Sequence, residues 1–271
     1  MTLIDGIPDG RIDFLDRGFA YGDGVFRTMR IQAGRVLHWD RHYAKLSEDC
    51  GRLGMVCPPQ ALLADELHRV VQAHPQGVAK IIVTRGAGGR GYGAPENPKP
   101  TRVVSGFDYA NSAHSRVQTG VQIRWCRTRV TEQPALAGVK HLNRLDSVLA
   151  RSEWTHRDIV EGLMLDRDGW VIEGTMTNVF VLEGNRLTTP ILDVAGVAGM
   201  QRDRLMSKCV GERLDCLEGR ISRDRVLGAE AVYLTNSVIG LWWVARLDDR
   251  VWSSHPMTAR LVAQIDSHDD D

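Results

Sequence analysis

The chain has 271 residues, of which 43% are apolar and 25% are charged, and its formal net charge is zero. This composition is ordinary for a globular protein and leaves room for one large domain or two modest ones. A neutral chain has no general attraction for nucleic acid or an anionic membrane, and no apolar run reaches membrane-spanning length. We therefore expect neither nucleic acid nor a membrane as a partner.

The cysteines and the first residues indicate the compartment. The five cysteines are scattered through the chain, and none stands in a CxxC or Cys/His ligand pattern. Such a set favours reduced thiols over a disulfide framework or a zinc site, so we expect no metal. The N-terminal residues lack a basic stretch followed by an apolar core and do not resemble a signal peptide. Together these features predict a cytoplasmic protein.

Residues 1–109 alternate strand and helix signals and are predicted to form an N-terminal α/β lobe. Period-two alternation and buried apolar runs predict strands, whereas a helical apolar spacing predicts helices. The expected strands are residues 24–31, 36–37, 77–86 and 101–109, and the expected helices are residues 40–54 and 59–75. The stretch "GAGGRGYGAPENPKP" is a loop because glycine and proline interrupt regular structure. Small polar residues at 110–115 form the expected linker.

Residues 116–271 are predicted to form a C-terminal, cofactor-binding α/β lobe. A strand is expected at 121–130, and a helix is expected to begin near Leu142. Short turns separate the next four apolar runs, which therefore predict a β-meander. The runs are residues 161–166, 170–174, 178–182 and 186–190, followed by a helix at 199–214 and a strand at 230–238. The fold class is thus α+β with two lobes.

Lys140 is the first candidate functional residue. The chain has 5 Lys against 29 Arg, yet this lysine stands in "LAGVKHLNRL", directly after small and apolar residues. Such a lysine either extends its amine to water or is held in a pocket for amine chemistry. The local pattern alone leaves both alternatives open.

Three further stretches carry polar groups that could bind a ligand. Glu173 ends a strand in "VIEGTMTNVF", where its carboxylate could act on a ligand or simply form a turn. The small residues of "DVAGVAGMQRDR" precede a helix, where free backbone N–H groups could hold a phosphate or merely form a tight corner. The arginines of "RGAGGRGYG" could grip a carboxylate or belong to an exposed, mobile loop.

Taken together, these features favour one cofactor. An amine that forms an imine, a carboxylate and a phosphate cradle are the groups needed to hold pyridoxal phosphate. The carboxylate would pair with the pyridine N–H, and a protonated ring would withdraw electrons from a carbanion.

The motifs resemble those of the fold-type IV pyridoxal-phosphate enzymes, which include branched-chain aminotransferases, D-amino acid aminotransferases and aminodeoxychorismate lyases. The stretches "DRGFAYGDGVF", "TRGAGGRGY", "LAGVKHLNRLDSVLAR", "EGTMTNVF" and "AGVAG" occur in the family's order and at its spacing, over nearly the whole chain. The stretches "KHLNRL" and "RGAGGRGY" resemble motifs that are specific to the lyase branch, whereas the other motifs are shared by all three branches. The resemblance implies a two-domain fold-type IV enzyme, a homodimer, with its active site between the lobes.

The resemblance also implies which residues bind the cofactor. Lys140 would form the covalent bond to pyridoxal phosphate and then act as the proton shuttle, and Glu173 would pair with the pyridine nitrogen. The remaining residues would lie around the phosphate, as backbone N–H donors or close neighbours: Val197, Ala198, Asn236 and Ser237. For the substrate, the matching positions are Phe26, Thr28, Arg90 and Tyr92.

Two positions depart from the family pattern. Lys45 in "HYAKL" stands where relatives have an arginine that binds the cofactor phosphate. Lysine keeps the charge but loses the bidentate fork, so Arg41 could assist. Arg27 stands where relatives often have an acidic or small residue, which leaves the substrate preference open if its side chain faces the site.

The implied reaction converts 4-amino-4-deoxychorismate, a small molecule, to 4-aminobenzoate and pyruvate in folate biosynthesis. Lysine suits this chemistry because a neutral amine is both nucleophile and base. The main alternative is an aminotransferase of the same fold that acts on a D- or branched-chain amino acid. The other alternative is a non-catalytic pyridoxal-phosphate-binding protein.

Overall fold

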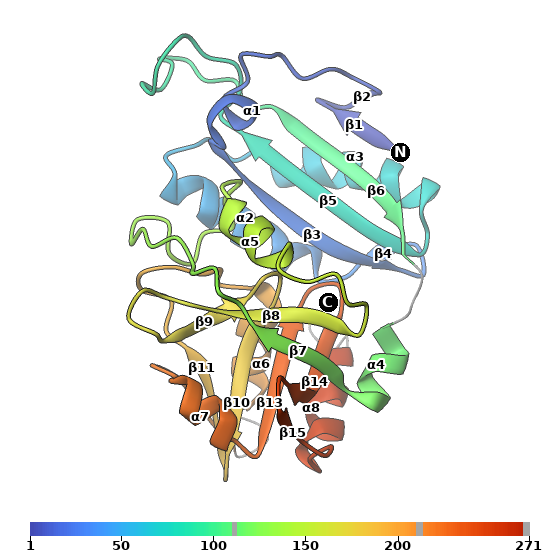
Figure 1. The fold of residues 1–271 in the computed structure, drawn as a ribbon. Coiled ribbons are helices and arrows are strands. Elements are labelled where there is room, and N and C mark those ends of the chain that lie inside the picture. Colours follow the sequence, from blue (N-terminus) through green and yellow to red (C-terminus); the bar gives the residue numbers. More distant parts are fainter. Residues whose placement is uncertain (110–112, 210–213, 268–271) are drawn as a thin grey trace. The chain divides into compact units, whose positions relative to one another are not determined.

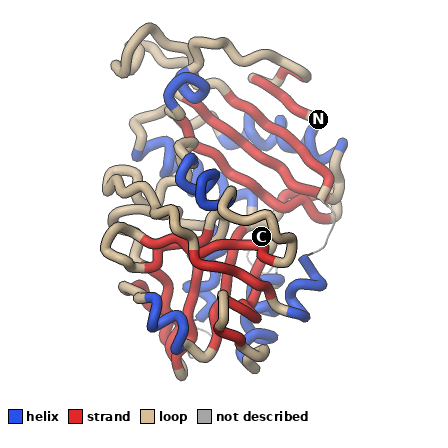
Figure 2. Tube along the Cα trace, viewed as in Figure 1, coloured by secondary structure: helices blue, strands red, loops and turns tan. Residues whose placement is uncertain are grey.

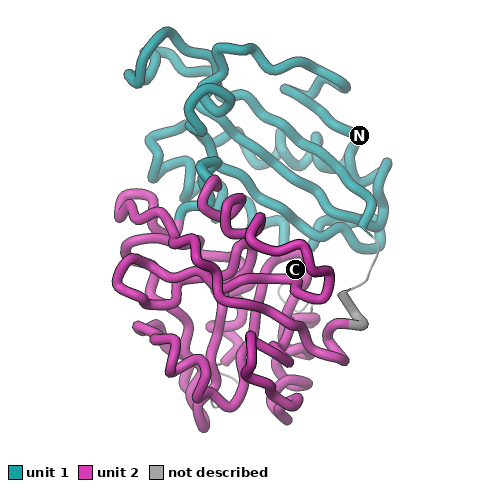
Figure 3. The backbone as a smooth tube through the Cα atoms, viewed as in Figure 1, with its two compact units in different colours: residues 1–110, 139–143, 268–271 teal, residues 111–138, 144–267 magenta. Residues whose placement is uncertain are grey.

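A computed structural model of the chain describes residues 1–109, 113–209 and 214–267. These residues form two compact units, which Figure 3 colours separately. Unit 1 contains residues 1–109 and 139–143, and unit 2 contains residues 113–138 and 144–267. The sequence placed 139–143 in the C-terminal lobe, whereas their contacts lie in unit 1. Of the expected linker, 110–112 lie outside the described residues, and the rest begins helix α4 (Ala113–Thr119).

Unit 1 is built on a six-stranded antiparallel sheet with the strand order β2-β1-β6-β5-β3-β4 (Figure 1). The long central strands are the ones that the alternation and the apolar runs predicted. The strands are β1 (Thr2–Ile4), β2 (Ile7–Pro8), β3 (Gly24–Gln32), β4 (Arg35–Val36), β5 (Gly77–Thr84) and β6 (Arg102–Asp108).

Helices α2 (Trp39–Arg52) and α3 (Gln60–Ala73) cover one face of this sheet, and the short helix α1 (Arg17–Tyr21) precedes β3. Alternate residues of β3, such as Val25 and Met29, are fully buried against Leu46 and Leu63 of the two helices. The other face of the sheet carries the intervening residues of β3, which are only half-buried. Unit 1 therefore has one packed face and one open face.

The segment 139–143 adds a short pairing to the first half of β3. The Phe26 N–H donates to the Lys140 carbonyl at 3.0 Å, and the Leu142 N–H donates to the Gly24 carbonyl at 2.9 Å. Strand β4 pairs with β3 only at its far end, so this edge of β3 is available. The expected helix therefore begins later than predicted, as α5 (Leu145–Arg151).

Unit 2 is built on a nine-stranded mixed sheet, which Figure 2 shows in red. The path runs β12-β11-β10-β13-β14-β7-β8-β9, and β15 pairs with β14. The strands are β7 (Val121–Trp125), β8 (Ile159–Leu165), β9 (Val171–Gly174), β10 (Asn178–Glu183), β11 (Arg186–Pro190), β12 (Asp215–Gly219), β13 (Ala231–Asn236), β14 (Gly240–Leu247) and β15 (Arg250–Val251).

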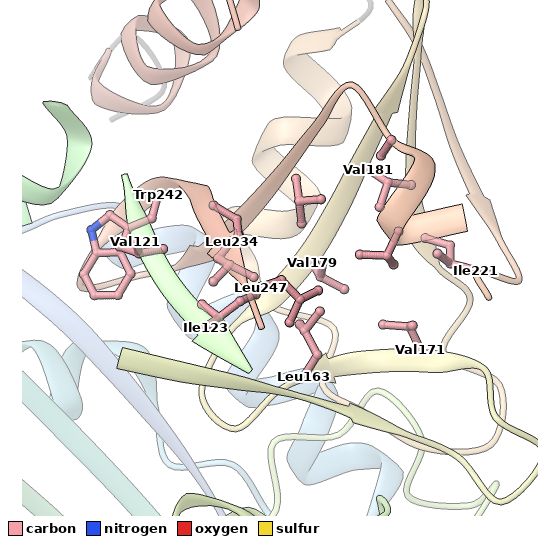
Figure 4. Packing of buried hydrophobic residues seen from close by; sticks show 14 of the residues in the cluster. Val121, Ile123, Leu163, Val171, Val179, Val181, Ile221, Leu234, Trp242 and Leu247 are labelled. Atoms are coloured by element: carbon pink, nitrogen blue, oxygen red, sulfur yellow. The ribbon is translucent and has the colours of Figure 1, made fainter. Parts of the chain in front are cut away.

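The predicted four-stranded meander is wrong. Its strands form two hairpins, β8–β9 and β10–β11, and three other strands stand between them in the sheet order. Strand β9 nevertheless contacts β10 and β11, so the sheet curls around its own apolar side chains. Figure 4 shows this interior, where residues of β7, β8, β10 and β14 meet.

Helices cover the rest of the unit 2 sheet. α6 (Met200–Cys209) and α8 (Met257–Asp266) pack together over β13 and β14 through Leu205, Tyr233 and Leu261. α7 (Arg223–Gly228) contributes Val226 to the curled interior. No helix among the described residues is both long and apolar enough to cross a bilayer.

Candidate active site

Lys140 lies in unit 1 beside the open face of the sheet. Its Nζ stands 4.4 Å from the centre of the Phe26 ring. Its backbone is fixed on both sides, because its carbonyl accepts from Phe26 and its N–H donates to Asp49 at 3.2 Å. The candidate amine thus projects from a segment held by β3 and α2.

Arg27 does not face the open side of the sheet. It is buried, donates to the Asp49 carboxylate, and donates to the Lys45 carbonyl at 2.9 Å. Burial raises the pKa of Asp49, while Arg27 and the Lys140 N–H oppose this shift. Arg27 therefore ties β3 to α2, and its side chain is directed away from Phe26 and Thr28.

Phe26 and Thr28 lie on the open face of unit 1, as the alternation of β3 predicted. Both are half-buried, and the residues that alternate with them belong to the core. Because the Phe26 ring lies beside the Lys140 amine, this face is the candidate substrate face of unit 1.

Arg90 and Tyr92 lie in the glycine-rich loop between β5 and β6, and both are exposed. A residue that the sequence analysis overlooked holds this loop. Arg17 of α1 is buried and donates to the carbonyls of Gly91 and Gly93 at 3.1 Å and of Tyr92 at 2.9 Å. The motif "DRG" was a sequence signal for this role of Arg17. It places an arginine at the start of a helix, where the local pattern gives the side chain no function.

Asp23 links the same loop to the sheet. Its carboxylate accepts from Arg17 and Arg85, each at 2.8 Å. Burial would raise the pKa of Asp23, but the hydrogen bonds from Arg85 and Arg17 outweigh it and hold the pKa below its usual value. The neighbouring Gly22 is left-handed, with φ +68°, and a Cβ there would lie 2.6 Å from the Asn143 side chain. Asn143 also donates to the Gly22 carbonyl at 3.2 Å.

Lys45 lies on α2 of unit 1 with a side chain that is 19% exposed, and its Nζ is 3.8 Å from Glu48. Arg41, one turn earlier on the same helix, is exposed. Both are cations on the helix that Arg27 ties to β3.

Glu173 is buried at the end of β9 in unit 2. Its carboxylate accepts from the Val197 N–H at 2.8 Å, and it lies 3.8 Å from Arg144. Arg144 belongs to the "KHLNRL" stretch, so this motif supplies residues to both units. Glu173 is thus a held carboxylate, not a turn residue.

The expected phosphate donors, Val197 and Ala198, donate to other groups of the chain in this structure. The Val197 N–H donates to Glu173, and the Ala198 N–H donates to the Gly138 carbonyl at 2.9 Å. Neither N–H is available to a phosphate. Helix α6 begins two residues later, and the N–H groups of Met200 and Gln201 have no acceptor among the described residues. Which N–H groups remain available depends on long-range partners that the motif does not contain.

Asn236 stabilises a turn after β13. Its amide donates to the Met176 carbonyl at 3.1 Å and accepts from the N–H groups of Val238 and Ile239, both at 2.9 Å. Ser237 within this turn is half-buried. The preceding Thr235 is fully buried, and its hydroxyl has no hydrogen-bond partner among the described residues.

Asn178 links Thr235 to the segment that precedes α6. Asn178 pairs with Thr235 across the sheet, and its amide donates to the Val197 carbonyl at 2.7 Å. A Cβ on Gly199 would lie 2.2 Å from Asn178 Oδ1. Unit 2 therefore gathers unused hydroxyl and N–H donors near one helix start.

The chain is similar to proteins of known sequence and structure. Residues 24–247 match the sequence model of a family described as amino-transferase class IV. An aminodeoxychorismate lyase from Vibrio harveyi is 30% identical over 241 residues, covering 89% of each chain. A D-alanine aminotransferase from Bacillus licheniformis is 27% identical, covering 90% of this chain and 85% of the relative.

A solved structure is still more similar. The crystal structure of 4-amino-4-deoxychorismate lyase from Pseudomonas aeruginosa superposes with a TM-score of 0.92 and 40% sequence identity, covering 98% of each chain.

Proposed function

The chain belongs to the class IV aminotransferase family, and on that premise we propose that it is a pyridoxal-phosphate-dependent lyase converting 4-amino-4-deoxychorismate to 4-aminobenzoate and pyruvate. The observation that carries the proposal is the 40% identity to a lyase of this name over 98% of both chains. The pathway served is folate biosynthesis.

The residues present fit pyridoxal phosphate. Lys140 offers an amine on a fixed backbone, and Glu173 offers a buried carboxylate to the pyridine nitrogen. The Val197 N–H and Arg144 hold that carboxylate in one orientation. When bound, the cofactor supplies an aldehyde for the amine and a ring that accepts negative charge.

The start of α6 is the phosphate site that this proposal favours. A helix N-terminus directs free N–H groups and a partial positive charge at an anion. Met200 and Gln201 supply those N–H groups, and the Thr235 hydroxyl and Ser237 are the neighbouring donors. Lys45 is proposed to add a positive charge in the place of the family arginine, with Arg41 as its alternative.

Lys140 is proposed to move protons during the reaction. Its Nζ takes the proton from the ring carbon that bears the substrate nitrogen, and it returns a proton to the departing enolpyruvyl group. The ether C–O bond breaks, pyruvate leaves, and the remaining ring becomes aromatic, which makes the step favourable. Lysine serves as nucleophile and base once it is neutral.

The substrate is proposed to lie on the open face of unit 1. Phe26 and Thr28 would contact its ring, since both lie on that face and the Phe26 ring centre is 4.4 Å from the Lys140 amine. Arg90 would pair with a carboxylate and Tyr92 would cover it, because both are exposed on the loop that Arg17 holds.

We further propose that the protein is a cytoplasmic homodimer. Large apolar side chains stand exposed in each unit, and where such side chains are contiguous they mark protein interfaces. They include Phe14, Phe19 and Tyr92 in unit 1, and Leu145, Val148 and Leu149 on α5 in unit 2. The five free cysteines suit a reducing compartment.

One assay tests the function. A lyase returns the cofactor to its starting form in each cycle, whereas an aminotransferase stops after one half-reaction without an acceptor. Purified protein is therefore expected to turn over 4-amino-4-deoxychorismate many times without any 2-oxo acid, giving pyruvate and 4-aminobenzoate in equal amounts. Absent conversion, together with rapid acceptor-dependent deamination of an ordinary amino acid, would identify an aminotransferase instead.

A further inference from the structure

Cys57 lies just beyond the end of α2, and the chain there folds back onto the helix. The Met55 N–H donates to the Cys50 carbonyl at 2.8 Å, which closes a turn after the last residues of α2. The Tyr43 hydroxyl of α2 donates to the Pro58 carbonyl at 3.1 Å. These two hydrogen bonds hold the segment that carries Cys57 against the side of the helix.

Three side chains of α2 surround the Cys57 thiol. Tyr43, Ser47 and Cys50 have the i, i+4, i+7 spacing of one helix face. Each of them forms a hydrogen bond with the Cys57 sulfur. Cys50 is fully buried, whereas Cys57 is half-buried and can be reached from solvent. The two cysteines are therefore a thiol pair in contact, with one accessible member.

This environment makes Cys57 the reactive thiol of the pair. The hydrogen bond from Cys50 lowers the pKa of Cys57 to about 7 against the opposing effect of burial, and Tyr43 and Ser47 assist. The same hydrogen bond, together with burial, raises the pKa of Cys50 well above its usual range. About half of Cys57 is therefore thiolate at neutral pH, and the thiolate is the form that attacks an electrophile.

We propose that Cys57 and Cys50 form a peroxide-sensitive modification site that ends in an internal disulfide. The Cys57 thiolate attacks one peroxide oxygen, the O–O bond breaks, and a sulfenic acid forms. The departing hydroxide takes up the proton that Cys57 had lost and becomes water. The Cys50 sulfur then attacks the Cys57 sulfur, and the sulfenic oxygen leaves with the Cys50 proton as a second water. The two thiols lose two electrons, which reduce the peroxide.

Oxidation of Cys57 prepares Cys50 for the second step. The hydrogen bond to Cys57 is the main cause of the high Cys50 pKa, and the negative charge of Cys57 adds to it. A sulfenic acid is neutral at this stage, so the Cys50 thiol loses its proton more readily. Sulfurs already in hydrogen-bond contact need only a small movement to reach the bond length of about 2.05 Å. Disulfides of reducing compartments are usually transient and redox-sensing.

The pair is adjacent to the residue that positions the candidate amine. Asp49 precedes Cys50 on α2, and its carboxylate accepts from the Lys140 N–H at 3.2 Å. It also accepts from the buried Arg27. Movement of Cys50 toward Cys57 would displace Asp49, so the disulfide should slow turnover. This consequence rests on the proposed function, whereas the modification site does not.

Mass spectrometry tests the site directly. Trypsin separates the two cysteines because Arg52 lies between them, so a disulfide joins peptides 46–52 and 53–69. Reduced full-length protein treated with hydrogen peroxide should yield the joined peptides, and dithiothreitol should separate them. Cys57→Ser should not form them.

Cys50→Ala tests the division of roles between the two thiols. The variant should retain a sulfenic acid at Cys57, which dimedone traps, because no second thiol is present to displace the oxygen. Cys57 should also react with peroxide about fivefold more slowly at pH 7. Without the hydrogen bond from Cys50, its thiolate fraction falls by more than its intrinsic nucleophilicity rises.

The remaining cysteines supply the controls. Cys126 is buried, and burial raises its pKa to about 12, so it should stay unmodified. Cys216 is half-buried and forms a hydrogen bond with Cys209. Cys216→Ser breaks that second pair and should leave the joining of Cys50 and Cys57 unchanged.

Two results would overturn the proposal: no joined peptides in the oxidised wild type, or oxidation of Cys57 in Cys50→Ala at the wild-type rate. Turnover shows how far the effect extends. A loss that dithiothreitol reverses, and that Cys57→Ser does not show, would support the site and extend its effect to Lys140. Unchanged turnover beside the joined peptides would support the site and confine its effect to the pair. An enzyme inactive before oxidation would remove the proposed function alone, because the joined peptides are measured without turnover.

Discussion

The carboxylate of Asp49 on α2 accepts a hydrogen bond from the backbone N–H of Lys140, with an N–O distance of 3.2 Å. The same oxygen accepts from Arg27 on β3. One buried carboxylate therefore fixes the helix that carries Lys45, the strand that carries Phe26, and the segment that carries the candidate amine. Asp49 acts through Lys140 and is a positioning residue.

Removal of Asp49 should show that Arg27 and Asp49 are coupled, meaning that each depends on the other for its effect on stability. Asp49→Ala leaves the buried Arg27 guanidinium without its partner, so the free energy of unfolding should fall by about 3–5 kcal/mol. The double variant Arg27→Met, Asp49→Ala should lose less than the sum of the single variants, as measured by urea denaturation. Asp65→Ala, at an exposed carboxylate of α3 that has no hydrogen bond or ion pair among the described residues, should change stability by less than about 0.5 kcal/mol. Strict additivity of the two single changes would refute the coupling.

Lys140 should be the lysine that binds the cofactor. Borohydride reduction of the holoenzyme followed by peptide mapping is expected to place the cofactor mass on this residue, because its amine stands on the open face of unit 1. A label on Lys45, Lys80, Lys99 or Lys208 would contradict the assignment. Lys140→Ala should bind the cofactor without reducible linkage and lose turnover.

Arg17 should control the loop that carries Arg90 and Tyr92. Arg17→Gln removes the donors to three loop carbonyls, so trypsin should cleave after Arg90 faster than in the wild type. KM should rise about tenfold, equivalent to about 1.4 kcal/mol, while cofactor content stays constant. Arg11→Gln, at an exposed arginine outside this network, is the control. Equal cleavage rates in Arg17→Gln and the wild type would show that Arg17 does not hold the loop.

Asp23 gives stability a defined pH dependence. Its pKa is held below the usual value by Arg85 and Arg17 against burial, so ionised Asp23 stabilises the folded state. That contribution is complete above the unfolded pKa of about 4, and it is lost as the pH falls through the folded pKa. Urea denaturation should therefore show a constant stability difference between the wild type and Asp23→Asn above about pH 5, shrinking below about pH 4. A difference that stays constant down to low pH would contradict this role.

Local periodicity was sufficient where one face of an element is buried. The alternation in β3 predicted its strand, and the structure places Phe26 and Thr28 on one face of it and Arg27 on the other. The apolar spacing of α2 and α3 was equally informative, because each helix packs one stripe on the sheet.

Long-range pairing was not available from the same patterns. A helix was expected to begin near Leu142, because nothing local reveals that residues 139–143 pair with β3. The meander failed for a similar reason, since β13, β14 and β7 lie between its two hairpins. Strand β14 was not predicted at all, although it is central to unit 2.

The candidate site shows the same contrast between features that local sequence predicts and features that depend on long-range pairing. The motifs made Lys140, Glu173 and the stretch before α6 candidates, because each combines a chemical group with a local turn or strand end. They did not reveal that the N–H groups of Val197 and Ala198 donate to Glu173 and Gly138, which lie elsewhere in the chain. Arg17 was overlooked since its acceptors lie in a distant loop.

Glu161 of β8 should position Glu173. Glu161 is fully buried. Its carboxylate accepts hydrogen bonds from five donors, which belong either to the next residue or to the loop after Glu173. The donors are the N–H groups of Gly162, Thr175 and Met176 and the hydroxyls of Thr175 and Thr177, at 2.5–3.1 Å. The carboxylate therefore fixes the loop at the end of β9.

Glu161→Gln tests this role. An amide offers one acceptor oxygen and turns an N–H₂ group toward donors, so the free energy of unfolding should fall by about 3 kcal/mol. The cofactor dissociation constant, measured by absorbance titration, should rise because the end of β9 that carries Glu173 is no longer fixed. Glu153→Gln is the matched control, since Glu153 also accepts two backbone N–H groups, at 2.9 Å and 2.7 Å, but from residues 127 and 128. It should lower stability without changing cofactor affinity. Equal cofactor affinity in Glu161→Gln and the wild type would restrict Glu161 to a structural role, because its effect would then stop at the loop.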